Sequence, residues 1–233
     1  MGLDHYHQTY FHAYHGQPVV VDSNPRLLML PWAIPRVRAI CSNARFIVVL
    51  RDPISRAFSQ WALPAILGLE ARSFVSYIVQ NLVRWQQRGN VFDLPETEAL
   101  WRITNDTSTV RKVCFDCVLE SGCYAINLSR WLAVFPRSQF LILTTDQLNR
   151  PETVSAIYQH VGVDPSRGLD VAPNSNSWRR YIGSDGEGKA SGMVPDTSSI
   201  SLLEEFYTPQ DVALCQVMKW SKTPWLGQIR DWA

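Results

Sequence analysis

Short uninterrupted apolar runs alternate along the chain with longer segments in which apolar residues recur every three or four positions. The runs predict buried strands at 18–22 ("PVVVD"), 45–50 ("RFIVVL") and 139–145 ("QFLILTT"). Their apolar residues follow one another without alternation, which is typical of parallel strands covered on both faces. Strands that alternate with helices in this way predict an α/β fold, a parallel sheet flanked by helices.

The segments with helical periodicity lie between and beyond these runs. They predict helices at 3–15, 31–42, from Ser55 onward, 73–88, 124–135, 151–162 and 199–219. Residues 90–110 are polar and predict an irregular insertion. Residues 164–196 contain Pro, Gly, Asn and Ser without periodicity, so we expect one long loop, and long loops in compact domains are usually functional or disordered.

The length and the charge of the chain indicate one globular domain and argue against nucleic-acid binding. The 233 residues, 46% apolar and 18% charged, suit one globular domain over 1–233. A formal net charge of +1 argues against a partner such as nucleic acid, although a local basic pocket remains compatible with it. No apolar run approaches the roughly 20 residues that cross a bilayer, so we expect no membrane segment in this chain.

The cysteines and histidines form two candidate metal-binding motifs, and both are incomplete. Cys114 and Cys117 form a lone CxxC motif without a second pair or a nearby His, and zinc needs four ligands. His12 and His15 could share one face of the helix predicted at 3–15, but a partly exposed helix with aromatic packing explains that segment better, since Asp4 is the only carboxylate near them. We therefore predict no metal site.

The most informative stretch is "FIVVLRDPISRAFSQW" (46–61), where a buried strand ends on Arg51. Pro53 suits a turn, and Asp52 or Ser55 can cap the helix that follows. The N-terminus of that helix carries partial positive charge, and a guanidinium beside it suits a phosphate group. The alternative is that Arg51 closes an ion pair within the protein, and the sequence alone leaves both interpretations open.

These residues resemble the 3′-phosphate-binding segment of sulfotransferases that use 3′-phosphoadenosine 5′-phosphosulfate (PAPS). The resemblance is strongest to the carbohydrate branch, which includes the heparan sulfate N- and O-sulfotransferases. Segments 19–40, 121–163 and 202–218, with "TPWL" (223–226), also resemble the family in their order. The resemblance implies a P-loop-NTPase-like sulfotransferase fold, with PAPS as co-substrate and no metal.

The resemblance also implies roles for five residues. Arg51 and Ser59 match the pair that holds the 3′-phosphate of the nucleotide, and Asp22 matches the acidic residue proposed as general base. In "GEGKASGMVP" (186–195), Lys189 and Gly192 match a late loop that closes over the nucleotide, while Met193 stands where the family usually has Arg. The predicted loop at 164–196 would accordingly lie near the cofactor.

One family signature has no counterpart in these 233 residues: the Lys- and Gly-rich loop that cradles the 5′-phosphosulfate after an N-terminal strand. We expect the sequence to be an N-terminally incomplete copy of a sulfotransferase domain. Two alternatives remain: a degenerate nucleotide-binding module or pseudoenzyme that keeps the 3′-phosphate half-site, and an unrelated scaffold in which Arg51 only forms an ion pair.

By resemblance, the reaction transfers a sulfuryl group to a hydroxyl or amine of a glycan-type or small-molecule acceptor, in the Golgi lumen for animal members. A further basic group either contacts an anionic glycan or forms a solvated helix face: Arg84, Arg88, Arg102, Arg111 and Lys112. The sequence does not identify the acceptor.

Overall fold

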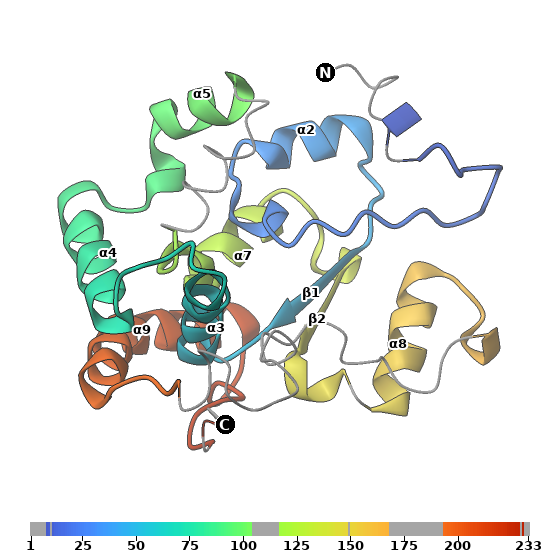
Figure 1. Cartoon of the computed structure of the whole chain (residues 1–233). Coiled ribbons are helices and arrows are strands. Elements are labelled where there is room, and N and C mark those ends of the chain that lie inside the picture. Colours follow the sequence, from blue (N-terminus) through green and yellow to red (C-terminus); the bar gives the residue numbers. More distant parts are fainter. Residues whose placement is uncertain are drawn as a thin grey trace.

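The computed structural model describes residues 8–9, 11–103, 117–148, 150–167, 193–228 and 230. Within these ranges the sheet has two strands, β1 (Phe46–Leu50) and β2 (Phe140–Thr144), which lie side by side at the centre of the fold (Figure 1). They pair in parallel, with Phe46 opposite Phe140 and Leu50 opposite Thr144. Two of the predicted strands and their parallel arrangement are therefore confirmed.

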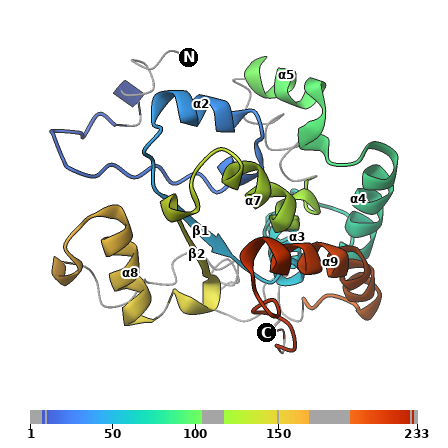
Figure 2. The same cartoon turned by 180° about the vertical axis from the view of Figure 1, so that it is seen from behind.

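Helices surround the two strands. The α-helices are α2 (Ala33–Ile40), α3 (Pro53–Ile66), α4 (Phe74–Arg88), α5 (Pro95–Ile103), α7 (Tyr124–Leu132), α8 (Pro151–Val161) and α9 (Thr197–Met218). Single turns of 3₁₀ helix lie at Leu27–Met29, Val91–Asp93, Glu120–Gly122, Arg137–Gln139, Thr145–Gln147 and Pro165–Arg167. Seen from behind, α7 and α9 lie on one side of the strands, and α8 stands apart on the other side, beside β2 (Figure 2).

The helices begin where local chemistry stabilises an N-terminus. The carboxylate of Asp52 caps α3, and Pro53 occupies its first turn, where the missing N–H costs nothing. The hydroxyl of Ser73 accepts a hydrogen bond from the Ser76 amide at the start of α4. Pro151 opens α8, as the sequence predicted.

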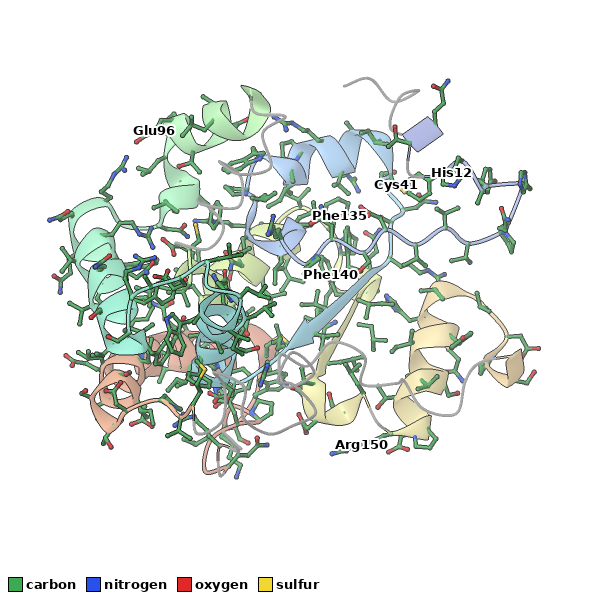
Figure 3. The ribbon with its side chains drawn as sticks, viewed as in Figure 1. His12, Cys41, Glu96, Phe135, Phe140 and Arg150 are labelled. Carbon is green, nitrogen blue, oxygen red and sulfur yellow. The ribbon has the colours of Figure 1, made fainter. Side chains whose placement is uncertain are left out.

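The strands are buried on the face that meets α7 and α9. Phe46 stacks on Phe140, with ring centroids 4.7 Å apart, and Trp131 and Phe135 of the α7 region pack edge-on against Phe46. Figure 3 labels Phe135 and Phe140 close together near the amino ends of the strands. Toward the carboxyl ends, Leu50 joins a separate cluster that includes residues of α7 and α9.

The opposite face of β1 is less covered than the sequence predicted. Ile47 keeps 37% and Val49 41% of its surface exposed, whereas Leu50 is fully buried. The expectation that both faces of this strand are covered is therefore wrong within the described part of the chain.

Near the start of the chain, the predicted strand at 18–22 is wrong, and the predicted helix at 3–15 is confirmed only at residues 8–9, which are helical. Residues 18–22 form no strand, and Val20 and Val21 are 50% and 69% exposed; β-branched residues favour a strand only where a neighbouring strand and a packed face are available. Residues 11–15 form turns because no buried face stabilises so short a helix. Residues 3–7 and 10 of the predicted helix lie outside the described residues.

Two predicted irregular regions have different outcomes. Part of 90–110 is ordered as helix α5, whose first turn carries Glu96 and Glu98, so the expectation of an irregular insertion is wrong there. Residues 168–192 of the predicted loop 164–196 lie outside the described residues. No helix in the described ranges combines the length and the hydropathy that a membrane span requires.

Candidate functional site

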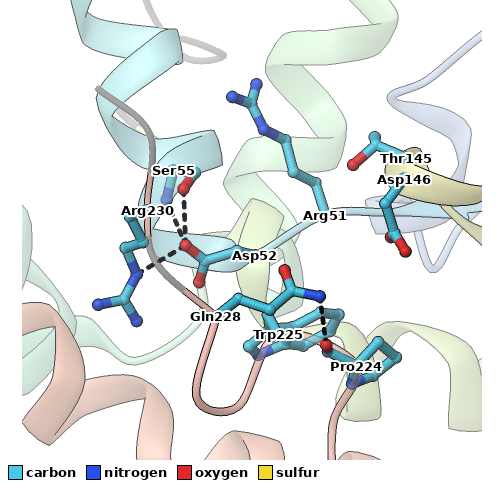
Figure 4. Close-up of a pocket in the computed structure, with 9 residues that line it drawn as sticks. All are labelled: Arg51, Asp52, Ser55, Thr145, Asp146, Pro224, Trp225, Gln228 and Arg230. Carbon is cyan, nitrogen blue, oxygen red and sulfur yellow. Dashed lines mark hydrogen bonds and ion pairs between the residues drawn. The ribbon is translucent and has the colours of Figure 1, made fainter. Parts of the chain in front are cut away.

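The cavity that contains Arg51 lies at the carboxyl ends of both strands. It encloses about 180 Å³ and is lined by Arg51, Asp52, Ser55, Thr145, Asp146, Pro224, Trp225, Gln228 and Arg230 (Figure 4). Three parts of the chain therefore meet here: the start of α3, the turn after β2, and the C-terminal segment 223–230. In open parallel sheets this edge is where ligands bind.

The N-terminus of α3 forms one wall of the cavity. Asp52 accepts hydrogen bonds from the amides of Ile54 and Ser55, and Ser55 Oγ donates to Asp52 Oδ2 at 2.7 Å. The sequence left Asp52 and Ser55 open as the capping residue, and the structure selects Asp52. The cap stabilises α3 but places a carboxylate in the cavity beside Arg51.

Arg230 pairs with that carboxylate. Its Nε donates to Asp52 Oδ2 at 2.8 Å, and its Nη1 donates to Glu204 of α9 at 2.8 Å. Partial burial alone would lower the pKa of Arg230, but the hydrogen bonds and charges of Glu204 and Asp52 outweigh it and raise the pKa above its ordinary value. The guanidinium therefore stays charged at any physiological pH.

The C-terminal segment is fixed against the helices that frame the cavity. Trp225 is 6% exposed, and its Nε1 donates to Asp211 Oδ2 of α9 at 2.9 Å. Burial raises the pKa of Asp211 to about 6, and the nearby charge of Asp52 acts in the same direction against the hydrogen bond from Trp225 and the charge of Arg230. Tyr124 of α7 packs against Trp225 with ring centroids 6.0 Å apart.

Tyr124 also positions the backbone of Arg51. Its hydroxyl is 3.0 Å from the Arg51 carbonyl oxygen and donates to it, which fixes the end of β1 against α7. Burial raises the pKa of Tyr124, so the phenol keeps the proton that this hydrogen bond needs. Figure 4 shows the Arg51 side chain extending from the end of β1 in a direction away from the Asp52–Arg230 pair.

The two residues predicted to hold a 3′-phosphate come from adjacent elements. Arg51 lines the cavity at the end of β1. Ser59 lies one helical turn beyond Ser55 on α3, so the helix face that carries Ser55 in the cavity wall carries Ser59 farther along. Ser59 is partly exposed and does not line the cavity itself.

The other predicted site residues are not brought into the cavity by the described structure. Asp22 is exposed in an irregular segment before the first 3₁₀ turn and does not line the cavity. Lys189 and Gly192 lie outside the described residues. Within the described ranges no group of three or more His, Cys, Asp or Glu side chains could hold a metal ion.

Of the five basic residues considered as possible glycan contacts, two form ion pairs with glutamates and three have side chains outside the described part of the chain. Arg84 binds the buried Glu120 through both terminal nitrogens, at 2.6 and 3.0 Å, so it belongs to the core and neither alternative describes it. Arg88 forms an exposed ion pair with Glu96. The side chains of Arg102, Arg111 and Lys112 lie outside the described part of the chain.

Three features of the cavity were not predicted from the sequence: the ion pair between Asp52 and Arg230, the lining by Thr145 and Asp146, and the lining by Pro224, Trp225, Gln228 and Arg230. A signal existed for the second, because Thr145 and Asp146 directly follow the apolar run of β2 and the carboxyl ends of parallel strands share one edge. Nothing in the spacing indicated that residue 230 would meet residue 52.

Comparisons with known proteins show what the chain is similar to. No family model matches the chain. It is 30% identical to human carbohydrate sulfotransferase 15 over 193 residues, which cover 78% of this chain and 31% of that protein. It is 27% identical to mouse bifunctional heparan sulfate N-deacetylase/N-sulfotransferase 4 over 214 residues, which cover 83% of this chain and 22% of that protein. The chain therefore spans less than a third of the length of these curated relatives.

A solved structure supports the fold. The crystal structure of a sulfotransferase from Alicyclobacillus acidocaldarius superposes with a TM-score of 0.68 at 18% identity, over 97% of this chain and 74% of that one. At this identity the likeness concerns the fold, and the relatives above supply the sequence relationship. The chain is homologous to carbohydrate sulfotransferase 15 and to the bifunctional heparan sulfate N-deacetylase/N-sulfotransferase over part of their lengths, and it shares the fold of a solved sulfotransferase.

Proposed function

We propose that the chain is the nucleotide-binding part of an enzyme that transfers a sulfuryl group from PAPS to a hydroxyl or amine of a glycan-type acceptor. The observation that carries the proposal is the position of Arg51. It lines a cavity at the carboxyl edge of a parallel sheet, beside the capped N-terminus of α3. That the curated relatives are named as sulfotransferases supports the same function.

The family resemblance assigns Arg51 and Ser59 to the ribose 3′-phosphate, and the chemistry of these side chains suits that role. A guanidinium offers a planar pair of donors to phosphate oxygens, a serine hydroxyl adds one more, and the start of α3 contributes partial positive charge. Lys189 and Gly192 complete the nucleotide site by resemblance alone.

Transfer proceeds by in-line attack. The acceptor oxygen or nitrogen bonds to sulfur while the bond from sulfur to the 5′-phosphate oxygen breaks, and adenosine 3′,5′-bisphosphate leaves. The acceptor's proton passes to a general base, for which Asp22 is the candidate. Asp22→Asn should therefore abolish transfer and leave nucleotide affinity within about twofold, because the base acts on the acceptor.

A second candidate is a nucleotide-binding module without transfer activity. The observation that favours it is the lining of the cavity, whose described cations are Arg51 and Arg230 with no lysine. Sulfuryl transfer needs positive charge at the leaving 5′-phosphate, a role that the resemblance gives to a lysine.

Two measurements separate these functions. Calorimetric titration with adenosine 3′,5′-bisphosphate should detect binding in both cases, and Arg51→Gln should weaken it about a hundredfold. Transfer of radiolabelled sulfate from PAPS to heparan and chondroitin acceptors should occur only for the enzyme, assayed with the chain and with any coding sequence found upstream. Absence of nucleotide binding would contradict both functions. Golgi residence stays a prediction from the animal members of the family.

A further inference from the structure

The cavity holds two carboxylates that oppose the proposed ligand. Asp52 caps α3 from within the cavity wall, and Asp146 lines the opposite wall after β2. An anion bound in this cavity would share it with both negative charges, and charge repulsion in a partly desolvated cavity weakens binding. Some group has to offset this repulsion if the site binds an anion.

The two carboxylates are not equally compensated. Asp52 keeps only 11% of its side-chain surface exposed and contacts Arg230, itself 24% exposed, at 2.8 Å. Asp146 is 50% exposed, and its partner Arg150 lies 3.8 Å away and is 54% exposed. Arg150 extends outward from the start of α8 (Figure 3). Solvent already screens the second pair, whereas the first is sheltered enough for its charge balance to matter.

We propose that Arg230 is a positioning residue for the nucleotide: by neutralising Asp52, it lets Arg51 bind a phosphate next to the carboxylate that caps α3. The inference rests on the proposed function. It gives the C-terminal segment 223–230 a part in the anion site, and it separates two roles of Asp52. The carboxylate stabilises the helix start, and Arg230 prevents the same carboxylate from repelling the ligand.

The fold holds Arg230 in place from two sides. Glu204 of α9 binds its Nη1, and the same segment is fixed upstream by the buried ring of Trp225, which is hydrogen-bonded to Asp211. Both contacts are with residues of α9. We therefore expect the Arg230 guanidinium to stay paired with the Asp52 carboxylate and to balance its negative charge.

The test is a double-mutant cycle on the dissociation constant of adenosine 3′,5′-bisphosphate, measured by calorimetry at low salt. Arg230→Gln should weaken binding about tenfold, because Asp52 is left uncompensated. Asp52→Asn keeps a good capping residue and removes the repulsive charge, so it should leave binding unchanged or tighten it. In the Asp52→Asn background, Arg230→Gln should bring the affinity back to about the wild-type value, because both charges of the pair are then absent. Arg150→Gln is the matched control and should change binding less than twofold.

The outcomes separate this inference from the proposed function. If the unmodified chain does not bind the nucleotide, the proposed function fails and the inference fails with it. If it binds and Arg230→Gln leaves the affinity unchanged, the inference alone is overturned. If Asp52→Asn weakens binding as much as Arg230→Gln does, the pair only holds the segment in place, and charge compensation is equally overturned.

Discussion

The two ends of the sheet both carry arginines, but the backbone around them differs in polarity. At the carboxyl end, α3 begins directly after β1, and side-chain acceptors meet backbone N–H groups: Asp52 accepts from Ile54 and Ser55. At the amino end, α8 ends beside the segments that precede the strands, and side-chain donors meet backbone carbonyls. There Arg45 donates to the His160 carbonyl, and Gln139 donates to Ala44 at 2.7 Å.

The larger hollow lies at the amino end. It encloses about 690 Å³ and is lined by Arg38, Ser42, Asn43, Arg45, Pro136, Ser138, Gln139, Gln159 and His160. Its arginines are directed to carbonyl oxygens, since Arg38 donates to the Ser42 carbonyl and Arg45 to the end of α8. The comparison teaches that the larger volume and the arginines of the amino end do not favour it as an anion site, whereas the helix N-terminus at the carboxyl end favours the site proposed there.

The largest effect should come from the aromatic packing that supports the amino end. Phe140→Ala removes a ring that is 5% exposed and stacked on Phe46, so the free energy of unfolding should fall by about 3–5 kcal/mol. Urea denaturation followed by tryptophan fluorescence measures it. A loss below about 1 kcal/mol would show that the strands do not depend on this cluster.

The affinity for the nucleotide should depend on the arginine at the carboxyl end of the sheet and not on the one at the amino end. Arg51→Gln should weaken binding of adenosine 3′,5′-bisphosphate about a hundredfold, because a charged bidentate contact is lost. Arg45→Gln, the matched change at the amino end, should alter it less than twofold. Calorimetry at one salt concentration measures both, and an equal loss in the two variants would contradict the assignment of the site to the carboxyl end.

Asp211 gives the carboxyl end its own pH dependence. Its pKa is raised from 3.8 in the unfolded chain to about 6 in the folded chain, so the folded chain binds the proton more tightly. The free energy of unfolding is therefore highest below pH 3.8, falls as the pH rises, and reaches its lower value above about pH 6. After allowance for its partial exposure, the loss should be on the order of 1 kcal/mol.

The control for this prediction is Asp211→Asn, whose amide oxygen can still accept from Trp225 Nε1. The difference in unfolding free energy between wild type and variant should change between pH 4 and pH 6.5, with wild type losing stability relative to the variant. A constant difference across that range would mean that the Asp211 carboxyl is not perturbed by burial.

The smallest effect concerns Arg45 as a partner of the α8 C-terminus. A cation near a helix C-terminus stabilises it by about 0.3–1 kcal/mol at an exposed position, so Arg45→Gln should lower the free energy of unfolding by about that amount. Thermal unfolding at low and high salt measures it. An effect that salt does not reduce would indicate that the contact is not electrostatic.

Much of the fold could be predicted from local pattern. The runs at β1 and β2 and most of the helices around them were found because each carries its own apolar repeat, although α3 begins at Pro53, two residues before the predicted start at Ser55. The predicted strand at 18–22 failed because strand formation depends on a neighbour that local sequence does not specify. Helix α5 was missed because its short, polar segment has a weak apolar repeat.

The candidate site was only half predictable. Arg51 followed from its position at the end of an apolar strand, and its placement in a cavity at the sheet edge agrees with that prediction. The ion pair between Asp52 and Arg230 joins residues 178 positions apart, and no periodicity encodes such a contact. The roles of Ser59, Asp22, Lys189 and Gly192 remain predictions.

A crystal structure of the chain with adenosine 3′,5′-bisphosphate tests the central claim most directly. We predict that the 3′-phosphate lies at the carboxyl edge of the sheet, within hydrogen-bonding distance of the Arg51 guanidinium and the Ser59 hydroxyl, with Arg230 still bound to Asp52. A nucleotide bound instead in the hollow beside Arg45 and His160, with Arg51 contacting only protein, would contradict the account.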